Sequence, residues 1–510
     1  MLGPRGAVSA RVGVAVTHLA VILVYLVALL GVGIWKARRL RTQADFAVAG
    51  QRLTPWVLVG TMLATWIGTG SVLGNAGKTY ETGAAAFLLP LGGVLGIALL
   101  TRVAGRVRGQ GGWTVPEIIG RRFGDLPRVL SALALVVAYL VIVSYQYNAG
   151  GAVLRTVLVD GAGEPLLSDA AATALAAAFI VAYTMLAGLL SVAYTDVANG
   201  IVMTLAFAVA LPVLWAKAGG MAGMAAAFQA TGRPDHLHLW GVWSGLDVVN
   251  FCLPPFLLVL GDANMFQRFS ACRDARGAAR ATTGLVFAVA VVELLIIACA
   301  WVAASLIPDA ADGRHVLVFA AARFLPPLLG AVLLTTLVGV IISTADSYLL
   351  VPATTLVRDI WLRRRGGGGG AEPDAAAAGD ADGAADGTNT ARGERRLVLA
   401  SRLVVLGLGF VAYLVSRGFA ASEGFFERAL YAYTIYGAAI TPALLAALFW
   451  RGATRTGAVA SIAGGVVTTL LWKEWLASRL AGTWLGGVDE VIPAITVSVL
   501  CLVLGSLRRR

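Results

Sequence analysis

Residues 55–77 read PWVLVGTMLATWIGTGSVLGNAG. This stretch is long and apolar enough to cross a bilayer, but glycines interrupt its second half at positions 68, 70, 74 and 77. An interrupted helix is tolerated at membrane depth only where protein or water satisfies the freed backbone groups. The stretch therefore predicts a discontinuous membrane helix that lies beside a cavity.

A second interrupted stretch follows later in the chain. Residues 247–269 read DVVNFCLPPFLLVLGDANMFQRF, with Pro254 next to Pro255. Proline removes an amide donor and clashes with the preceding turn, so we expect the helix to break at this pair. The two stretches begin two blocks of five spans each. Because five is an odd number, the blocks have opposite topology, which indicates an inverted repeat.

The composition excludes a soluble protein. Of 510 residues, 58% are hydrophobic and only 13% are charged, about half the charge of a soluble domain. The mean hydropathy is +0.80. Four cysteines without a CxxC pair and four scattered histidines indicate neither a disulfide scaffold nor a metal cluster. The sequence therefore predicts an all-α polytopic membrane protein.

Apolar runs predict about thirteen transmembrane helices. Most of the 40 Lys and Arg residues fall in the loops of one side, which predicts an outside N-terminus and a cytosolic C-terminus. The net charge of +12 could suggest that the protein binds nucleic acid, but the basic residues lie in short groups between apolar runs, which argues against this. The expected spans are 14–35, 55–77, 84–104, 127–154, 169–190, 192–216, 246–267, 281–306, 326–357, 397–416, 427–449, 457–477 and 490–507.

The spans and the loops between them predict the organisation of the chain. Residues 366–396 are rich in Gly, Ala and Asp with almost no large apolar side chain, which is typical of a disordered linker, here cytosolic. The predicted parts are an N-terminal part with the first span (1–53), a first repeat half (54–216), an outer loop (217–245), a second repeat half (246–365 and 397–449) around the linker (366–396), and two accessory C-terminal spans (450–510).

Three carboxylates fall inside predicted spans, namely Asp196, Glu293 and Asp346. A carboxylate at the bilayer centre costs at least ~2.5 kcal/mol, so each needs a partner or a function. We expect Glu293 to face a solute cavity. The alternative is a carboxylate that only pairs neighbouring helices.

Span 326–357 carries adjacent hydroxyls at Ser343 and Thr344, with Ser347 one turn later. Sodium is a hard cation that prefers oxygen ligands, and the carbonyls of an interrupted helix together with hydroxyls of a facing helix supply them. The alternative is that these hydroxyls bond back to their own helix, as is common in membrane spans.

At this point the chain resembles the sodium:solute symporter family, which includes bacterial proline, pantothenate and galactose symporters. The resemblance rests on motifs that occur in order over about residues 43–460. The family implies a LeuT-type fold with a five-plus-five inverted repeat and two broken helices. The motifs are DFAVAGQRLTPW (45–56), TVPEIIGRRFG (114–124), AGLLSVAYTDVANG (187–200), GDANMFQRFSACRDARGAARA (261–281), ISTADSYLL (342–350) with RDIW (358–361), and TPALLAALFWRGAT (441–454).

The resemblance implies a sodium site and a solute site. Sodium is expected at the carbonyls of Ala64, Ile67 and Val340 and the hydroxyls of Ser343 and Thr344. A second sodium site, present in only some members, would use Asp196 and Ser347. The expected solute-binding residues are Trp66, Thr69, Gly70, Ser71, Gln146, Leu258, Val259, Glu293, Tyr431, Thr434 and Tyr436.

One departure limits what the resemblance implies. Trp66 stands where proline symporters have aspartate and the sugar symporter has asparagine, so neither solute carries over to this chain. The alternative for Trp66 is plain packing.

The expected function is sodium-driven symport of a small organic solute in the bacterial plasma membrane, with no cofactor other than the coupling ion Na+. Proton coupling on the same fold and a stand-alone membrane sensor are the alternatives. HExxH and GxSxG motifs are absent from the sequence, so we expect no enzyme activity. The expected partners are Na+, the solute and the lipid bilayer, but no nucleic acid, and the sequence does not determine an oligomeric state.

Overall fold

The computed structural model describes residues 4–37, 42–160, 164–310, 313–363, 387–418, 424–480 and 482–507. These residues are nearly all helical, and apart from isolated bridges such as Leu53 with Cys272 the described ranges hold no strand. The helices that build the bundle are α1 (Pro4–Ala37), α3 (Pro55–Trp66), α4 (Asn75–Thr82), α5 (Pro90–Gly109), α7 (Asp125–Val157), α8 (Asp169–Lys217), α10 (Gly245–Gly261), α11 (Ala263–Ala271), α12 (Ala275–Leu306), α14 (Pro327–Thr355), α17 (Gly387–Gly418), α18 (Phe425–Phe449), α19 (Arg455–Leu471) and α21 (Val491–Leu507).

Short elements connect these helices. They are α2 (Gln43–Val48), η1 (Ala49–Gln51), η2 (Gly70–Gly74), η3 (Gly83–Leu88), α6 (Val115–Phe123), α9 (Gly220–Ala230), η4 (Pro234–Leu237), η5 (Gly313–His315), α13 (Val316–Arg323), η6 (Leu356–Leu362), η7 (Trp472–Leu476), α20 (Ala477–Leu480) and η8 (Trp484–Gly487).

Each predicted span coincides with a helix or a broken pair of helices, which makes the chain an integral membrane protein. Within the described ranges, nine helices are long and apolar enough to cross a membrane, or up to ten with the bent pair that starts at Pro55. Helix α8 covers two predicted spans and is kinked at Gly188, whose φ of 59° suits glycine. Because α19 and α21 have only 17 residues each, the count of thirteen stays a prediction.

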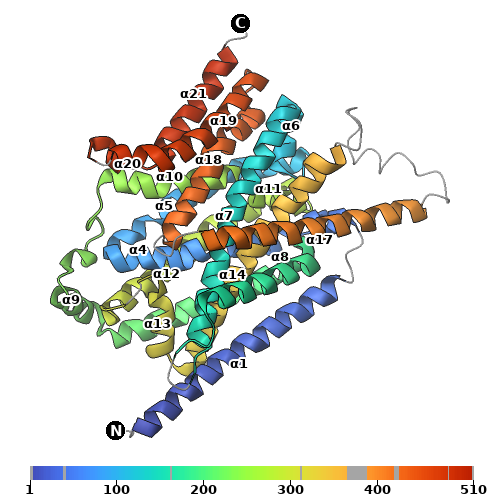
Figure 1. Cartoon of the computed structure of the whole chain (residues 1–510). Coiled ribbons are helices and arrows are strands. Elements are labelled where there is room, and N and C mark those ends of the chain that lie inside the picture. The colour runs from blue at the N-terminus through green and yellow to red at the C-terminus, as the bar shows by residue number, and fades with distance from the viewer. Residues whose placement is uncertain are drawn as a thin grey trace.

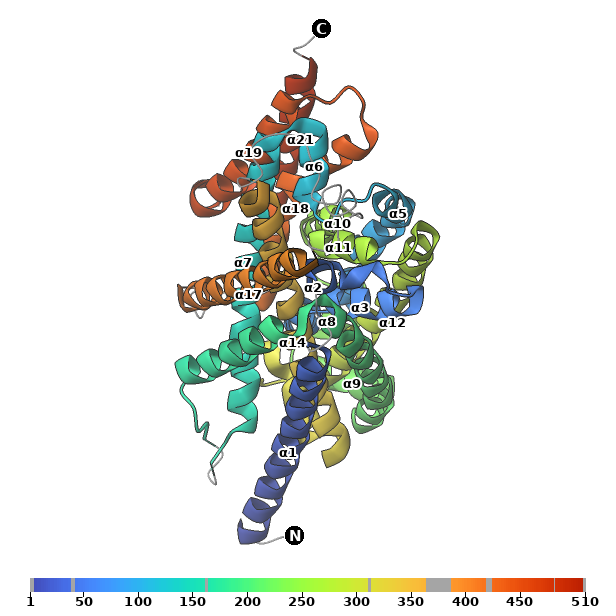
Figure 2. The same cartoon turned by 90° about the vertical axis from the view of Figure 1, so that its right-hand side faces the viewer.

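The helices form one bundle with accessory helices at two opposite edges. Figure 1 shows the N-terminus of α1 and the C-terminus after α21 at opposite ends of the molecule, and Figure 2 shows the same after a quarter turn. Helix α1 packs on α8 and α14, whereas α19 packs on α18 and α21. Between them α3 contacts α8, α12 and α14, so the first broken helix lies within the bundle.

The first break lies where the glycines predict it. Thr54 caps α3 by accepting a hydrogen bond from the amide of Val57, and Pro55 occupies the first turn, where its missing amide costs nothing. The helix ends at Trp66 because Ile67 has a non-helical ψ of 89°. The chain then continues through η2 into α4, and the two parts are bent by 55°. The carbonyls at the end of α3 are thereby free for other partners.

The second break differs from its prediction. Helix α10 continues through Pro254 and Pro255 and ends at Gly261, and the interruption falls at Asp262, with a ψ of 111°. Side chains compensate the backbone here, since the hydroxyl of Tyr436 donates to the Gly261 carbonyl at 2.7 Å. Similarly, Thr441 donates to the carbonyl of Leu257 at 2.7 Å. The prediction that the helix breaks at Pro254 and Pro255 is therefore wrong.

The predicted linker 366–396 is only partly described. Residues 366–386 lie outside the described residues, whereas α17 already begins at Gly387. The backbone amide of Gln43 donates to Glu394 at 2.7 Å, which ties this part of α17 to α2. Residues 387–396, which the sequence predicts to be disordered, therefore belong to helix α17. The other predicted part boundaries stay predictions.

Candidate functional site

The adjacent hydroxyls of α14 face the broken end of α3. Ser343 Oγ lies 3.4 Å from the carbonyl oxygen of Ala64, in the last turn of α3. Thr344 lies against the break itself, because a Cβ built on Gly68 would be 3.0 Å from both Cγ2 and Oγ1 of Thr344. The expected ligands Ile67 and Val340 are buried in the same core cluster. The structure thus brings Ser343 and Thr344 to the carbonyl end of a broken helix.

Among the described residues, the hydroxyl of Thr344 finds no hydrogen-bond partner although it is buried. An unpaired buried hydroxyl costs about 1–3 kcal/mol, so its presence needs a reason. Within the described ranges, no group of three His, Cys, Asp or Glu residues could hold a metal ion. The oxygens that Ser343, Thr344 and the end of α3 offer are hydroxyl and carbonyl oxygens, and a hard cation such as Na+ prefers oxygen ligands.

Asp196 lies directly beside this hydroxyl pair. Its Oδ1 accepts a hydrogen bond from Ser343 at 2.5 Å, and its Oδ2 accepts one from Thr61 of α3 at 2.5 Å. The same Oδ2 lies 3.4 Å from Nη2 of Arg268. One carboxylate of α8 therefore joins α3, α11 and α14 at the level of the first break.

Arg268 is the residue that the sequence reasoning missed. Its place one residue after the predicted span 246–267 predicts a basic loop residue, but its side chain is 0% exposed. Its Nη2 donates to Ser347 at 2.7 Å and its Nε to Thr61 at 3.1 Å. Asp196 and Ser347, the residues expected at a second sodium site, thus share a guanidinium. The position of Arg268 only six residues after the second break, at Asp262, is the feature of the sequence that could have indicated a role in the site.

The remaining predicted carboxylate of this region pairs with a neighbouring helix. Thr184 of α8 donates a hydrogen bond to Asp346 of α14, and both side chains are buried. This contact fits the alternative in which the carboxylate holds two helices together.

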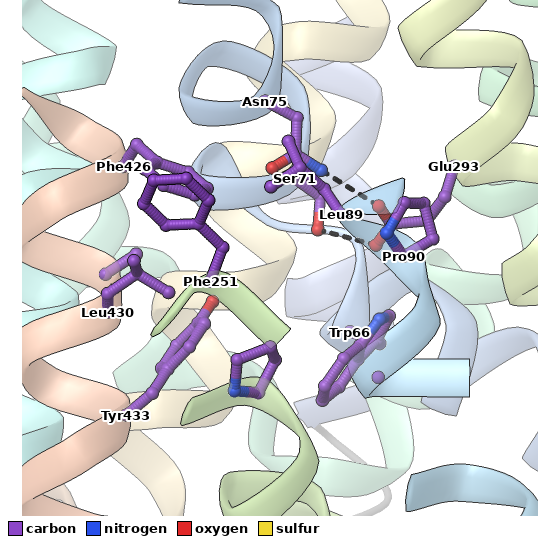
Figure 3. Close-up of a pocket in the computed structure, with 14 residues that line it drawn as sticks. Trp66, Ser71, Asn75, Leu89, Pro90, Phe251, Glu293, Phe426, Leu430 and Tyr433 are labelled. Atoms are coloured by element: carbon purple, nitrogen blue, oxygen red, sulfur yellow. Dashed lines mark hydrogen bonds between the residues drawn. The ribbon is translucent and has the colours of Figure 1, made fainter. Parts of the chain in front are cut away.

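A small cavity lies on the other side of the α3 break (Figure 3). Its free volume is about 40 Å³. Glu293 of α12 is 4% exposed and lines it. Its Oε1 accepts from Ser71 at 3.0 Å and its Oε2 from Asn75 at 2.9 Å. Both donors follow the break, so the interruption orients the carboxylate.

The predicted solute-binding residues divide into two groups. Trp66, Gly70, Ser71 and Glu293 line the cavity. Thr69 donates a hydrogen bond to Oε1 of Gln146, beside Gly68 rather than in the lining. The others outside the lining are Leu258, Val259, Tyr431, Thr434 and Tyr436. Their roles stay predictions, although the hydroxyl of Tyr436 already bonds the backbone at the second break.

Aromatic residues of two other helices complete the cavity. Phe251 comes from α10, and Phe426 and Tyr433 come from α18. In Figure 3 these rings lie across the cavity from the group of Ser71, Asn75 and Glu293. Sequence reasoning missed them because nothing in a local pattern distinguishes a ring that faces a cavity from one that packs in a core.

Known proteins are similar to this chain over most of its length. A model of the sodium:solute symporter family matches residues 46–372. The osmoregulated proline transporter OpuE of Bacillus subtilis is 24% identical over 504 residues, 95% of this chain and 93% of that protein. A sodium/proline symporter of Staphylococcus aureus is 22% identical over 478 residues, 90% of this chain and 86% of that protein.

Solved structures with the same fold cover nearly the whole chain. A Na+-coupled sialic acid symporter in a substrate-bound outward-open state matches with a TM-score of 0.75 at 16% identity, over 96% of this chain and 97% of that one. MhsT in complex with L-phenylalanine matches with a TM-score of 0.53 at 13% identity, over 89% of this chain and 97% of that one. The predicted LeuT-type fold is thereby confirmed.

Proposed function

The chain belongs to the sodium:solute symporter family, whose members are transporters and not enzymes, and we propose that it imports a small organic solute together with Na+ by alternating access. The sodium/proline symporters among its relatives support the coupling ion. They do not support proline itself, since Trp66 occupies the place of the aspartate found in proline symporters.

The single observation that carries the proposal is the buried, unpaired hydroxyl of Thr344 at the first break. In the proposed site, Na+ binds the hydroxyls of Ser343 and Thr344 and the carbonyls of Ala64, Ile67 and Val340. Sodium entry satisfies the Thr344 oxygen, for which the described ranges supply no partner.

We propose one sodium ion at this site. A second ion between Asp196 and Ser347 would have to displace the guanidinium of Arg268, which contacts both. A membrane potential of about 100 mV supplies ~2.3 kcal/mol for one charge, so a single Na+ sustains roughly 50-fold accumulation of a neutral solute.

Alternating access is supported by the size of the cavity. A free volume of about 40 Å³ accommodates a few water molecules, since each needs about 10–15 Å³ of such space. An organic solute therefore enters only after the helices around the cavity move apart. We propose that the solute contacts Trp66, Gly70, Ser71 and Glu293.

We also propose that the chain lies in the plasma membrane of a bacterium, with its N-terminus outside and its C-terminus in the cytosol.

Uptake into proteoliposomes tests this function. The purified chain is reconstituted, and amino acids, carboxylates, nucleobases, amines and polyols are offered with an inward Na+ gradient, an inward proton gradient, or neither, and protein-free liposomes measure the passive permeation of neutral amines. The proposal expects accumulation only with the Na+ gradient. Accumulation driven by protons alone would favour the proton-coupled alternative, and a Na+-stabilised protein that carries none of the solutes would favour the sensor.

A further inference from the structure

The cavity at the first break holds one carboxyl group and an aromatic wall, and from these we infer that the solute of this transporter is an organic cation, specifically a protonated primary or secondary amine without a carboxylate. The inference rests on the proposed function, because it names the solute class of the proposed solute cavity. It is argued from the acidic and basic side chains in the lining, from the hydrogen bonds of Glu293 and from the aromatic rings opposite Glu293.

The lining of the cavity is electrically one-sided. Its residues include Glu293 but no Lys, Arg or His, and the others are aromatic, aliphatic, glycine, serine or asparagine. Within the described part of the chain, Glu293 takes part in no recorded ion pair, in contrast to Asp196, which has Arg268. A buried carboxylate without a cation is costly, and a cationic solute supplies the missing charge.

The contacts of Glu293 leave it able to accept further hydrogen bonds. Ser71 donates to one carboxylate oxygen and Asn75 to the other, whereas each oxygen can accept about two such bonds. The two donors fix the orientation of the carboxylate and leave acceptor capacity on both oxygens. An ammonium group with two or three N–H donors matches that capacity, and a quaternary ammonium does not.

The rings opposite Glu293 suit the same group. The faces of aromatic rings attract cations within ≈6 Å of the ring centre. The chain already uses two of these rings in this way, since Nζ of Lys78 lies 5.0 Å from the centre of Phe251 and 5.9 Å from that of Phe426. Lys78 itself is not part of the lining, and it pairs with Glu81 at 3.2 Å.

A solute carboxylate finds no such partner in the cavity. Because the lining offers no basic side chain, an anion would place a second negative charge near Glu293. A zwitterion would satisfy Glu293 with its amine but leave its carboxylate without a counter-charge. These considerations favour an amine over the amino acid that has the same side chain.

Binding to the purified chain in detergent tests the inference, because neutral amines cross bilayers and would confuse an uptake assay. The ligands form three sets, and each set holds an amine, the amino acid with the same apolar part and the matching carboxylate. The sets are pyrrolidine, proline and cyclopentanecarboxylate; isopentylamine, leucine and 4-methylpentanoate; and phenethylamine, phenylalanine and 3-phenylpropanoate. Dissociation constants are measured by titration calorimetry at neutral pH in NaCl. We expect at least one amine to bind about 10- to 100-fold more tightly than its amino acid and its carboxylate, as a charge-assisted hydrogen bond allows.

Three variants separate charge from packing. Glu293→Gln keeps the shape but removes the charge, and it should weaken amine binding about 10- to 100-fold and abolish the preference over the carboxylate. Ser71→Ala keeps the charge and should weaken binding less. Glu164→Gln removes an exposed carboxylate outside the lining, and its amine binding should stay within about threefold of the wild type.

Other outcomes overturn the inference. Tighter binding of an amino acid or a carboxylate in all three sets would do so, and so would amine binding that survives Glu293→Gln unchanged. If none of the amines binds while Na+ still raises the unfolding temperature of the protein, the solute class is wrong and the sodium proposal stands. Retained stabilisation by Na+ in Glu293→Gln also shows that this variant is folded.

Discussion

Thr344→Ala is the substitution that most directly tests the proposed sodium site. If Na+ takes about five oxygens there, losing one weakens binding by roughly 1.5–3 kcal/mol, as for other contacts to a charged group. The half-saturating Na+ concentration for uptake should then rise about 10- to 100-fold. The change breaks no hydrogen bond within the part of the chain that the structure describes, because the hydroxyl has no partner there.

The expected effect on stability separates Thr344 from Ser343. Losing the threonine methyl costs about 1 kcal/mol, and removing an unpaired buried hydroxyl returns about 1–3 kcal/mol, so Thr344→Ala should be close to neutral without Na+. Ser343→Ala instead leaves Oδ1 of Asp196 without the donor at 2.5 Å. It should lower both the Na+ affinity and the unfolding temperature.

Two measurements on the reconstituted and the detergent-purified chain check this. Uptake is recorded against Na+ concentration for Thr344→Ala, Ser343→Ala and the control Thr344→Ser, and thermal unfolding is recorded with and without Na+. Thr344→Ser keeps the oxygen and should retain nearly wild-type sodium dependence. An unchanged Na+ curve in both alanine variants would refute the site, and a Thr344→Ser variant as damaged as Thr344→Ala would point to packing.

Three further predictions concern the surroundings of the site. Gly68→Ala should raise the half-saturating Na+ concentration because its Cβ would lie 3.0 Å from the Thr344 side chain, whereas Gly407→Ala, with nothing within 4 Å, should leave uptake unchanged; equal effects of the two would contradict this. Arg268→Met should lower the free energy of unfolding by about 3–5 kcal/mol by leaving Asp196 unpaired, and adding Asp196→Asn should restore part of it; additive losses in thermal unfolding would argue against the pair. Replacing residues 366–386 by a Gly/Ser tether of adequate reach should preserve Na+-driven uptake, and loss of uptake with normal protein abundance would show that the segment matters.

The fold was predictable because membrane depth imposes few solutions. Each apolar run has to become a helix, since lipid offers no partner to backbone groups. The glycines after Trp66 therefore predict the first break correctly. The second break could not be read from Pro254 and Pro255, because α10 continues through both prolines. The break lies at Asp262, where Tyr436 and Thr441 of α18, far away in sequence, bond the carbonyls of Gly261 and Leu257.

The site was predictable where ligands lie on one helix and unpredictable where helices meet. Ser343 and Thr344 are adjacent in sequence and face the break together. The sequence predicts that Arg268 lies in a loop, because charge near the end of a span is typical of loops. Only the tertiary structure shows that α11 places Arg268 inside the bundle, beside Asp196. The cavity side of Phe251 likewise depends on how α10 packs on α18, which no periodicity within α10 specifies.

The break after α3 offers a physical basis for coupling between the proposed ion and the solute. Ala64 and Ile67 lie at its first edge beside Ser343, and Gly70 and Ser71 lie at its second edge in the cavity lining. Between them a side chain at Gly68 would touch both Thr344 and Gln146. An ion that fixes the first edge therefore lowers the cost of ordering the second for the solute. Because coupling free energy is reciprocal, saturating solute should raise the equilibrium affinity for Na+ by the same factor by which Na+ raises solute affinity. Independent responses of the two sites would mean that the break does not transmit the coupling.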